Sequence, residues 1–241
     1  MELEEEIFVC LDCETTGLLA TDEVIEVAIA IFNFKEILQK FESLIDPGIY
    51  ISQQSISIHN ITNEMVQDSP KLEKILPLIC SMVGSHTIVG HNIQFDLLIL
   101  FEYAKRKKIP FPIRENSFID TFRLARLFAN SPSNKLESLM EFFHIHPPNR
   151  LHRAMNDVFV TIEIFKNLSK GFRSKKEILK NLKNPIRIKT MPLGKYKGKL
   201  FSEIPTKYLC WASSQNFDPD LLFSIETEKK RRFNRRKIFQ L

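Results

Sequence analysis

The segment Val24–Phe32 constrains the fold more than any other part of this chain. Its nine residues, VIEVAIAIF, include a single polar side chain, Glu26. A run of this length that is rich in β-branched residues is typical of a largely buried strand. A shorter apolar run, Ile7–Leu11, precedes it, and Glu36–Ile45 follows it and ends at an Asp-Pro-Gly turn. These three segments predict an antiparallel three-stranded meander at the start of the chain.

Helical spacing of apolar residues dominates after this meander. From Leu72 to Ile79, apolar residues recur at intervals of three and four, which predicts a helix. The other predicted elements are a strand at His86–Val89, a helix that Asn92 caps and that carries Phe95, Leu98 and Phe101, two helices at Asp120–Phe128 and Lys135–Phe143, and a helix that runs from the Pro147-Pro148-Asn149 break to Leu168. This order predicts an α/β fold with helices covering a sheet.

Composition excludes several classes of protein. With 44% apolar and 26% charged residues, the chain has enough apolar material for a core and is not disordered throughout. No apolar run approaches the roughly 20 residues of a membrane-spanning helix, so no membrane contact is expected. The acidic start, MELEEEIF, lacks the basic region of a secretory signal, which predicts a cytoplasmic protein. The four cysteines fit neither a disulfide framework nor a zinc site and are expected to be reduced.

Charge is distributed unevenly along the chain. Residues 173–241 contain 18 Lys or Arg and 6 Asp or Glu, a net charge of +12, whereas residues 1–172 contain 16 and 23, a net charge of −7. This asymmetry predicts an acidic domain over 1–172, a basic linker over 173–186 and a small basic domain over 187–241. A basic domain is typical of a partner rich in phosphate, such as nucleic acid. The alternative is a solvated lysine-rich tail.

Carboxylates follow two of the predicted strands. Asp12 and Glu14 lie two residues apart at the end of the first strand, so the period of a strand places both on one face. Asp96 follows a second strand, in the first turn of a predicted helix, and ligand sites form where strands end and helices begin. Adjacent carboxylates repel each other unless a cation lies between them, and their hard oxygens favour Mg²⁺ or Mn²⁺. For Asp12 and Glu14 alone, the alternative is a pair of surface acids on a loop.

His152 and Asp157 form the last candidate pair, in the sequence LHRAMND. Five residues of an ideal helix turn through about 500°, so the two side chains would point about 140° apart if both were helical. They can face one site only if His152 lies on irregular backbone before the helix that carries Asp157. The proline-containing break upstream permits this arrangement.

Together these residues resemble the three motifs of the DnaQ-like 3′–5′ exonucleases, the family of the DNA polymerase III epsilon subunit. The matching segments are Asp12-Cys13-Glu14-Thr15-Thr16-Gly17, His91-Asn92-Ile93-Gln94-Phe95-Asp96 and His152-Arg153-Ala154-Met155-Asn156-Asp157. The spacing from His152 to Asp157 is similar to that of the DEDDh branch, and the resemblance spans about residues 5–170. It implies an RNase H-like fold, with a mixed five-stranded sheet flanked by helices. Cys13 stands where the family usually has threonine, and its side chain is expected to point away from the carboxylates.

The resemblance also implies roles for particular residues. Asp12, Glu14, Asp96 and Asp157 would hold two Mg²⁺ ions, for which Mn²⁺ would substitute, and His152 would be the general base. The residues that would contact the 3′ end of the substrate are Thr15, Thr16, His59, Asn92 and Phe95. For Phe95 the alternative is packing in the core, and for His59 it is a contact within a loop.

The C-terminal block 191–212, MPLGKYKGKLFSEIPTKYLCWA, resembles a small uncharacterised bacterial domain that is sometimes fused to exonucleases. Its glycines permit close approach to a phosphate, and Lys195, Lys197 and Lys199 supply charge. Tyr196 is placed to stack on a base. The basic stretches Lys229–Arg232 and Arg235–Lys237 favour the same function. The alternative for the glycine-lysine repeat is a tight basic hairpin.

The sequence therefore predicts a metal-dependent 3′–5′ exodeoxyribonuclease that releases nucleoside monophosphates, most readily from single-stranded 3′ ends, in DNA replication or repair. Two alternatives stay open. An exoribonuclease of the same fold would carry the same motifs, since only contacts to the 2′-OH distinguish the substrates. A non-catalytic subunit would recruit a DNA polymerase or a repair factor, and the intact acidic motifs count against it.

Overall fold

A computed structural model describes residues 2–129, 131, 133–147 and 152–238 of the chain, with side chains up to residue 234 in the last range. The chain divides into two units, Met1–Leu179 and Lys180–Leu241, and each is described by itself. Within the described ranges, no helix combines the length and the apolar character needed to span a membrane.

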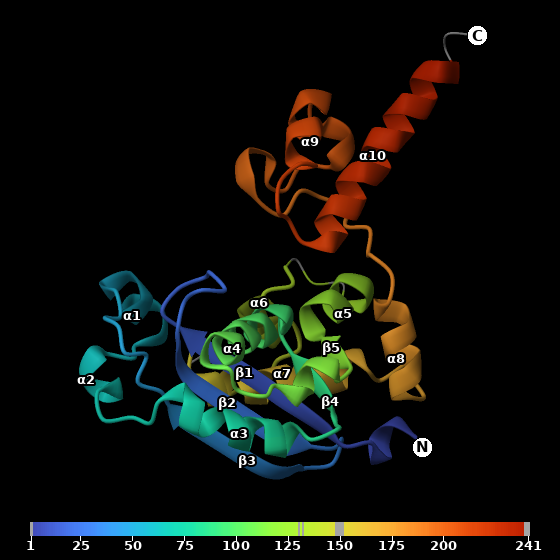
Figure 1. Cartoon of the computed structure of the whole chain (residues 1–241). Coiled ribbons are helices and arrows are strands. Elements are labelled where there is room, and N and C mark those ends of the chain that lie inside the picture. Colours follow the sequence, from blue (N-terminus) through green and yellow to red (C-terminus); the bar gives the residue numbers. More distant parts are fainter. Residues whose placement is uncertain (1, 130, 132, 148–151, 239–241) are drawn as a thin grey trace. The chain divides into compact units, whose positions relative to one another are not determined.

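The first unit is built on a mixed five-stranded sheet in the order β3-β2-β1-β4-β5 (Figure 1). The expected antiparallel meander is confirmed as β1 (Phe8–Thr15), β2 (Val24–Phe32) and β3 (Ile37–Leu44). Two short strands, β4 (Thr87–Gly90) and β5 (Phe118–Asp120), extend the sheet in parallel on the other side of β1. The largely apolar β2 lies second in the sheet, which explains why its faces are both covered.

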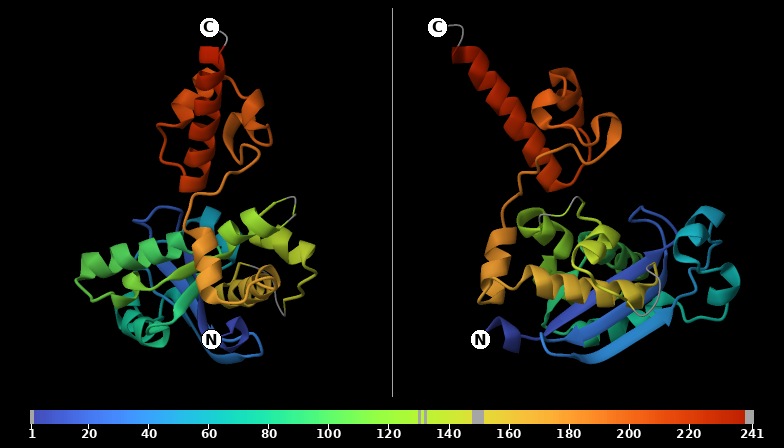
Figure 2. Two further views of the ribbon diagram at one scale, coloured as in Figure 1. Left: turned by 90° about the vertical axis from the view of Figure 1, so that its right-hand side faces the viewer. Right: turned by 180° about the vertical axis from the view of Figure 1, so that it is seen from behind.

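Helices cover the two faces of this sheet. The helices of the first unit are α1 (Gln53–His59), α2 (Asn63–Val66), α3 (Leu72–Val83), α4 (Gln94–Lys107), α5 (Thr121–Phe128), α6 (Leu136–Phe142), α7 (Ala154–Leu168) and α8 (Lys175–Leu182), with 3₁₀ turns at Leu3–Glu5 and Pro112–Glu115. Helices α3 and α4 pack on one face, against Val9 and Leu11 of β1. Helix α7 lies on the other face, as the view from behind in Figure 2 shows. Cys10 of β1 contacts α7 there, through its Sγ atom and the carbonyl of Val158, 3.7 Å apart.

One expectation about local structure needs correction. Helix α4 is not capped by Asn92: its N-cap is Ile93, and Asn92 has a left-handed backbone with φ 59°. The reason is that the N–H of Asn92 donates instead to Asp120 Oδ1 at 2.9 Å. The segment 173–186, predicted to be a basic linker, contains the short helix α8, whose Ile178 is fully buried; its role as a linker stays a prediction. Of the Pro147-Pro148-Asn149 break, residues 148 and 149 lie outside the described residues.

The second unit is small and mainly helical, as predicted. It contains 3₁₀ turns at Gly194–Tyr196 and Phe201–Glu203, helix α9 (Thr206–Ala212) and the long helix α10 (Pro219–Ile238). Its core is formed by Met191, Phe201, Ile204, Leu209, Ala212, Leu221 and Ile225. An isolated antiparallel bridge between Thr190 and Leu200 closes the loop between them. The alternative of a tight basic hairpin for this loop therefore has structural support.

Candidate active site

Three of the predicted acids converge at the end of β1. Asp12 and Glu14 project from the same face of this strand, the face on which α7 packs, and Asp157 projects from the first turn of α7. One carboxylate oxygen from each of the three lies within 4.8 Å of the other two. Residues far apart in the sequence thus form one acidic cluster.

Asp96 lies beside this cluster, in the first turn of α4. Its Oδ1 accepts a hydrogen bond from the backbone N–H of Cys13, at 2.9 Å, which ties the start of α4 to the strand between the other two acids. The Cys13 side chain packs against the core that α3 and α4 cover, on the face of β1 opposite Asp12 and Glu14, as expected; Asp96 approaches β1 from this α4 side.

The acids carry strongly raised pKa values. Burial raises the pKa of Asp12 well above its ordinary value, and the nearby Asp96 and Asp157 raise it further. Burial, again followed by neighbouring carboxylates, raises the pKa of Glu14 to about 8. Burial likewise raises that of Asp96 to about 7 and that of Asp157 to about 6. A cluster of this kind is unfavourable when ionised unless a cation compensates it. All of its donors are hard carboxylate oxygens, so the residues present fit Mg²⁺ or Mn²⁺.

His152 lies just before α7 on non-helical backbone, with φ 64°, as the five-residue spacing to Asp157 required. Its backbone N–H donates to Asp157 Oδ1 at 3.2 Å, which fixes the two residues relative to each other. The imidazole is 43% exposed and is therefore accessible to substrate. In this structure its Nε2 atom lies 3.1 Å from Glu137 Oε1 of α6 rather than against the acidic cluster.

The structure adds an ion pair that the sequence analysis missed. Glu26 of β2 is 2% exposed and pairs in register with Glu14 of β1. Its carboxylate accepts from Arg153 Nε at 3.1 Å and from an Arg153 terminal nitrogen at 2.6 Å. It also accepts from the backbone N–H of Ala154 at 2.9 Å, the first residue of α7. Glu26 therefore holds the start of the helix that carries Asp157. Its position as the lone polar residue of an apolar strand was the available signal, because buried charges are almost always paired.

The residues predicted to contact substrate from the β1–β2 turn stabilise that turn. Thr15 Oγ1 donates to the carbonyl of Gly17 at 2.6 Å, and Thr16 Oγ1 accepts from the N–H of Glu23 at 3.0 Å. A Cβ atom at Gly17 would lie 2.4 Å from Asp22 Oδ2, so a larger residue there would displace this carboxylate, which accepts from the N–H of Leu19 at 2.7 Å. These contacts hold both threonines next to Glu14.

The other three residues predicted to contact substrate have different environments. Asn92 is exposed, and Phe95 is half-buried against the core between the sheet and α3 and α4. His59 is 2% exposed, and its Nδ1 accepts from the N–H of Ile61 at 3.0 Å. Burial lowers the pKa of His59, and the neighbouring Arg153 lowers it as well. Phe95 thus makes the core packing contact, and His59 the contact within a loop, that were the alternatives to a role in binding substrate.

The basic stretch of α10 is largely neutralised within its own helix. Lys229 pairs with Glu226 at 2.6 Å, and Arg231 and Arg232 both pair with the buried Glu228 at 2.7 Å. These bonds lower the pKa of Glu228 to about 2, chiefly through Arg231. Glu226 and Glu228 thus offset two of the four positive charges of Lys229–Arg232, and the contribution of this stretch to nucleic-acid binding stays a prediction. The side chains of Arg235–Lys237 lie outside the described residues.

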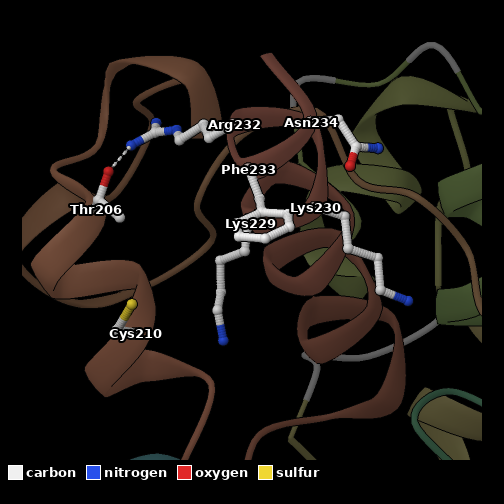
Figure 3. Close-up of a pocket in the computed structure, with 7 residues that line it drawn as sticks. All are labelled: Thr206, Cys210, Lys229, Lys230, Arg232, Phe233 and Asn234. Carbon is white, nitrogen blue, oxygen red and sulfur yellow. Dashed lines mark hydrogen bonds between the residues drawn. The ribbon is translucent and has the colours of Figure 1, made fainter. Parts of the chain in front are cut away.

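Helices α9 and α10 enclose a cavity of about 470 Å³ (Figure 3). It is lined by Thr206, Cys210, Lys229, Lys230, Arg232, Phe233 and Asn234. Arg232 donates to Thr206 Oγ1 across one end, at 2.8 Å. Most of the charge along this cavity is thus already satisfied by the protein.

Comparisons with known protein families match both units. Residues 9–165 match the model of a family described as "Exonuclease". Residues 175–222 match a second model, described as "Putative quorum-sensing-regulated virulence factor".

Two curated relatives illustrate the likeness. The chain is 35% identical over 194 residues to "DNA polymerase III PolC-type" of Caldanaerobacter subterraneus subsp. tengcongensis, covering 77% of this chain and 14% of that one. It is 32% identical over 163 residues to "DNA polymerase III subunit epsilon" of Aquifex aeolicus, covering 66% of this chain and 78% of that one. The chain thus spans only a small part of the PolC-type relative and most of the epsilon-type relative.

Solved structures share the fold of the first unit. "Exonuclease X in complex with 5′ overhanging duplex DNA" matches with a TM-score of 0.58 and 26% identity, over 71% of this chain and 99% of that one. Escherichia coli exonuclease I in complex with a dA16 oligonucleotide matches with a TM-score of 0.60 and 21% identity, over 74% and 43%. The predicted RNase H-like fold with a mixed five-stranded sheet is confirmed.

Proposed function

Because the chain belongs to the exonuclease family, we propose that it is a metal-dependent 3′–5′ exodeoxyribonuclease that releases nucleoside monophosphates. The observation that carries the proposal is the convergence of Asp12, Glu14 and Asp157 within 4.8 Å, with Asp96 beside them. Four neighbouring acids, two of them buried, have no evident structural purpose. Their raised pKa values indicate that ionising them together in the folded protein is unfavourable.

Asp12, Glu14, Asp96 and Asp157 would hold two Mg²⁺ ions, or Mn²⁺ in their place. When bound, such ions neutralise charge on a phosphodiester and make a water molecule more acidic. His152 would take a proton from the attacking water at Nε2 and so act as the general base. Its backbone bond to Asp157 keeps it next to the site, and its half-exposed imidazole would have to leave Glu137 to reach the attacking water.

The 3′ end of a strand would lie against the β1–β2 turn. Thr15 and Thr16 would meet the terminal hydroxyl there, because their contacts hold them beside Glu14. Asn92, exposed next to α4, would orient the strand, and Phe95 would press against the last bases. His59, whose pKa is influenced by the nearby charges of Glu26 and Arg153, would lie near the terminal nucleotide.

The domain organisation follows the charge. We propose an exonuclease domain over 1–172, a basic linker over 173–186 and an accessory domain over 187–241 that binds nucleic acid through Lys195, Tyr196, Lys197 and Lys199. Relatives named as DNA polymerase III chains support a place in DNA replication or repair, in the cytoplasm, with a polymerase or a repair factor as a further partner.

The test is Mg²⁺-dependent shortening of a 5′-labelled oligonucleotide. We expect a ladder of products that shorten from the 3′ end in wild type and none with Asp12→Ala. Glu36→Ala is the matched control, since Glu36 is an exposed acid in the turn between β2 and β3. Equal digestion by Asp12→Ala and wild type would show that the acidic cluster is not the active site.

Digestion of matched DNA and RNA oligonucleotides distinguishes the proposed exodeoxyribonuclease from the alternative exoribonuclease. Preferential digestion of RNA would make the protein an exoribonuclease with the same residues. DNA binding without cleavage at any Mg²⁺ or Mn²⁺ concentration would favour a recruiting subunit instead.

A further inference from the structure

Three aromatic rings lie in a row on the second unit. The ring centroids of Tyr196 and Tyr208 are 4.7 Å apart, and those of Tyr208 and Trp211 are 5.1 Å apart. We call these three residues the aromatic row. Trp211 at its end is 52% exposed, although the neighbouring Leu209 and Ala212 of α9 are fully buried. A single exposed ring would need no explanation, but three neighbouring rings with one open to solvent form a contiguous surface of the kind found at binding sites.

The backbone around the row holds the rings in place. Tyr208 and Trp211 are three residues apart on α9, so they lie on one side of that helix. Tyr196 comes from the loop that the Thr190–Leu200 bridge closes. Gly194 makes the approach of this loop possible: its φ is +71°, and a Cβ atom there would lie 2.8 Å from the Tyr208 hydroxyl oxygen. The row is therefore a fixed part of the fold.

Exposed lysines lie next to the ring residues along the chain. Lys195, Lys197 and Lys199 alternate along the loop, and Lys207 lies next to Tyr208; all four are exposed. Among the residues that the structure describes, none of the four forms an ion pair with a carboxylate. Lys195 Nζ lies 5.7 Å from the centroid of the Tyr196 ring. This uncompensated charge contrasts with α10, where glutamates of the same helix take up most of the cations.

From this arrangement we propose that the aromatic row binds single-stranded DNA, with bases stacked on Trp211 and Tyr196 and phosphates held by the exposed lysines. Stacking on an aromatic ring requires a base that is free of its partner strand, which selects single strands over duplexes. Stacking also tolerates any base, so a site of this kind binds without sequence preference. The proposal rests on the exonuclease function proposed above in that it takes DNA to be the substrate. It extends the four residues expected from sequence to Tyr208, Trp211 and Lys207.

Binding of the full chain to fluorescein-labelled (dT)20 in EDTA tests this directly, because no cleavage occurs without metal. Trp211 is the sole tryptophan of the chain, so its own fluorescence reports on stacking at the row. We expect quenching of this fluorescence as (dT)20 is added, and a Kd for Trp211→Ala that is about 5- to 100-fold weaker. Trp211→Phe, which keeps an aromatic face, is expected to retain most of the affinity.

Phe233→Ala is the matched control, because Phe233 is a 60% exposed ring of the same unit that lines the α9–α10 cavity. It should leave the affinity unchanged. Replacing Lys195 and Lys199 by glutamine should lower the slope of log affinity against log salt by about 0.7 for each phosphate that is no longer neutralised. Duplex DNA of the same length should compete weakly.

Three results would overturn the proposal: unchanged Trp211 fluorescence with (dT)20, wild-type affinity in Trp211→Ala, or a loss of affinity in Phe233→Ala instead. Binding of (rU)20 but not (dT)20 would overturn the choice of DNA. The outcome is separable from the exonuclease proposal. Cleavage in Mg²⁺ without a role for Trp211 would refute the row alone, and quenching without any cleavage would refute the nuclease alone.

Discussion

Replacing Glu26 by glutamine tests whether the buried ion pair positions the start of α7. The Glu26 carboxylate accepts two N–H groups of Arg153 and the backbone N–H of Ala154. Glutamine has nearly the same shape but turns one acceptor oxygen into a donor, which then faces these N–H groups. At least one hydrogen bond is broken, and the remaining ones no longer have a negative partner.

The expected decrease in the free energy of unfolding of Glu26→Gln depends on the burial of the ion pair and on the neighbouring charges. Breaking a fully buried pair by removing one partner costs about 3–5 kcal/mol. The cost is smaller here because the side chain of Arg153 is 42% exposed, so water can replace part of its interaction with Glu26. Removing the Glu26 charge also relieves some of the repulsion that raises the pKa of Asp12 and Glu14. We therefore expect the free energy of unfolding to fall by about 1–3 kcal/mol.

Activity should fall further than stability alone explains. The Ala154 N–H is the first of α7, and without its bond to Glu26 the backbone of His152 and Asp157 can move. Misplacement of catalytic groups by about 1 Å costs roughly 100-fold in rate, so we expect kcat for Glu26→Gln to fall about 10- to 100-fold, with KM little changed. Urea unfolding followed by circular dichroism and initial rates per folded molecule measure the two effects separately.

Glu6→Gln is the control for this experiment. Glu6 is also buried and pairs with Lys175 at 2.8 Å, but it precedes β1, at the opposite end of that strand from Asp12 and Glu14. It should lower stability without affecting kcat. If Glu26→Gln is less stable yet cleaves as fast per folded molecule as wild type, the positioning role of Glu26 is refuted.

Three further changes have defined outcomes. Mg²⁺ should raise the Tm of the wild type, because at 100 times its Kd it adds about 2.7 kcal/mol to the free energy of unfolding. In EDTA, Asp12→Asn should unfold at a higher temperature than wild type, and it should gain less stability from Mg²⁺. Scanning calorimetry with and without metal measures both effects. His152→Ala should lower kcat by about 100- to 10,000-fold while the Mg²⁺-induced rise in Tm persists, so loss of both would mean that His152 is structural. Ionised Glu228 should stabilise the second unit by about 1–2 kcal/mol at pH values above its ordinary pKa of about 4.3. This stabilisation should vanish as the pH falls through about 2. The Tm values of wild type and Glu228→Gln, measured from pH 7 to pH 2, should therefore converge at the acidic end.

The sequence was sufficient to predict the sheet and its acids because both depend on local patterns. The apolar run Val24–Phe32 defines a strand with the bounds that β2 has. The period of two places Asp12 and Glu14 on one face of β1, and the spacing from His152 to Asp157 requires the non-helical backbone that His152 adopts.

Contacts between distant segments were not predictable in the same way. The partner of Glu26 lies in a different part of the chain, so its burial was visible in the sequence but Arg153 was not identifiable as its partner. Asn92 fits the composition of a helix cap, and the bond to Asp120 from a neighbouring strand overrides that preference. The neutralised cations of α10 are a different case. Glu228 stands three and four residues before Arg231 and Arg232, a spacing that indicates helical ion pairs and that the count of net charge conceals.

The four proposed metal-binding residues come from β1, α4 and α7, which are synthesised in that order. A chain still on the ribosome therefore lacks Asp157, and with it the frame that Glu26 and Arg153 build around the start of α7, until most of the sheet has already been made. In the proposed function, the set of metal-binding residues would therefore become complete only once α7 has been made and packs on β1.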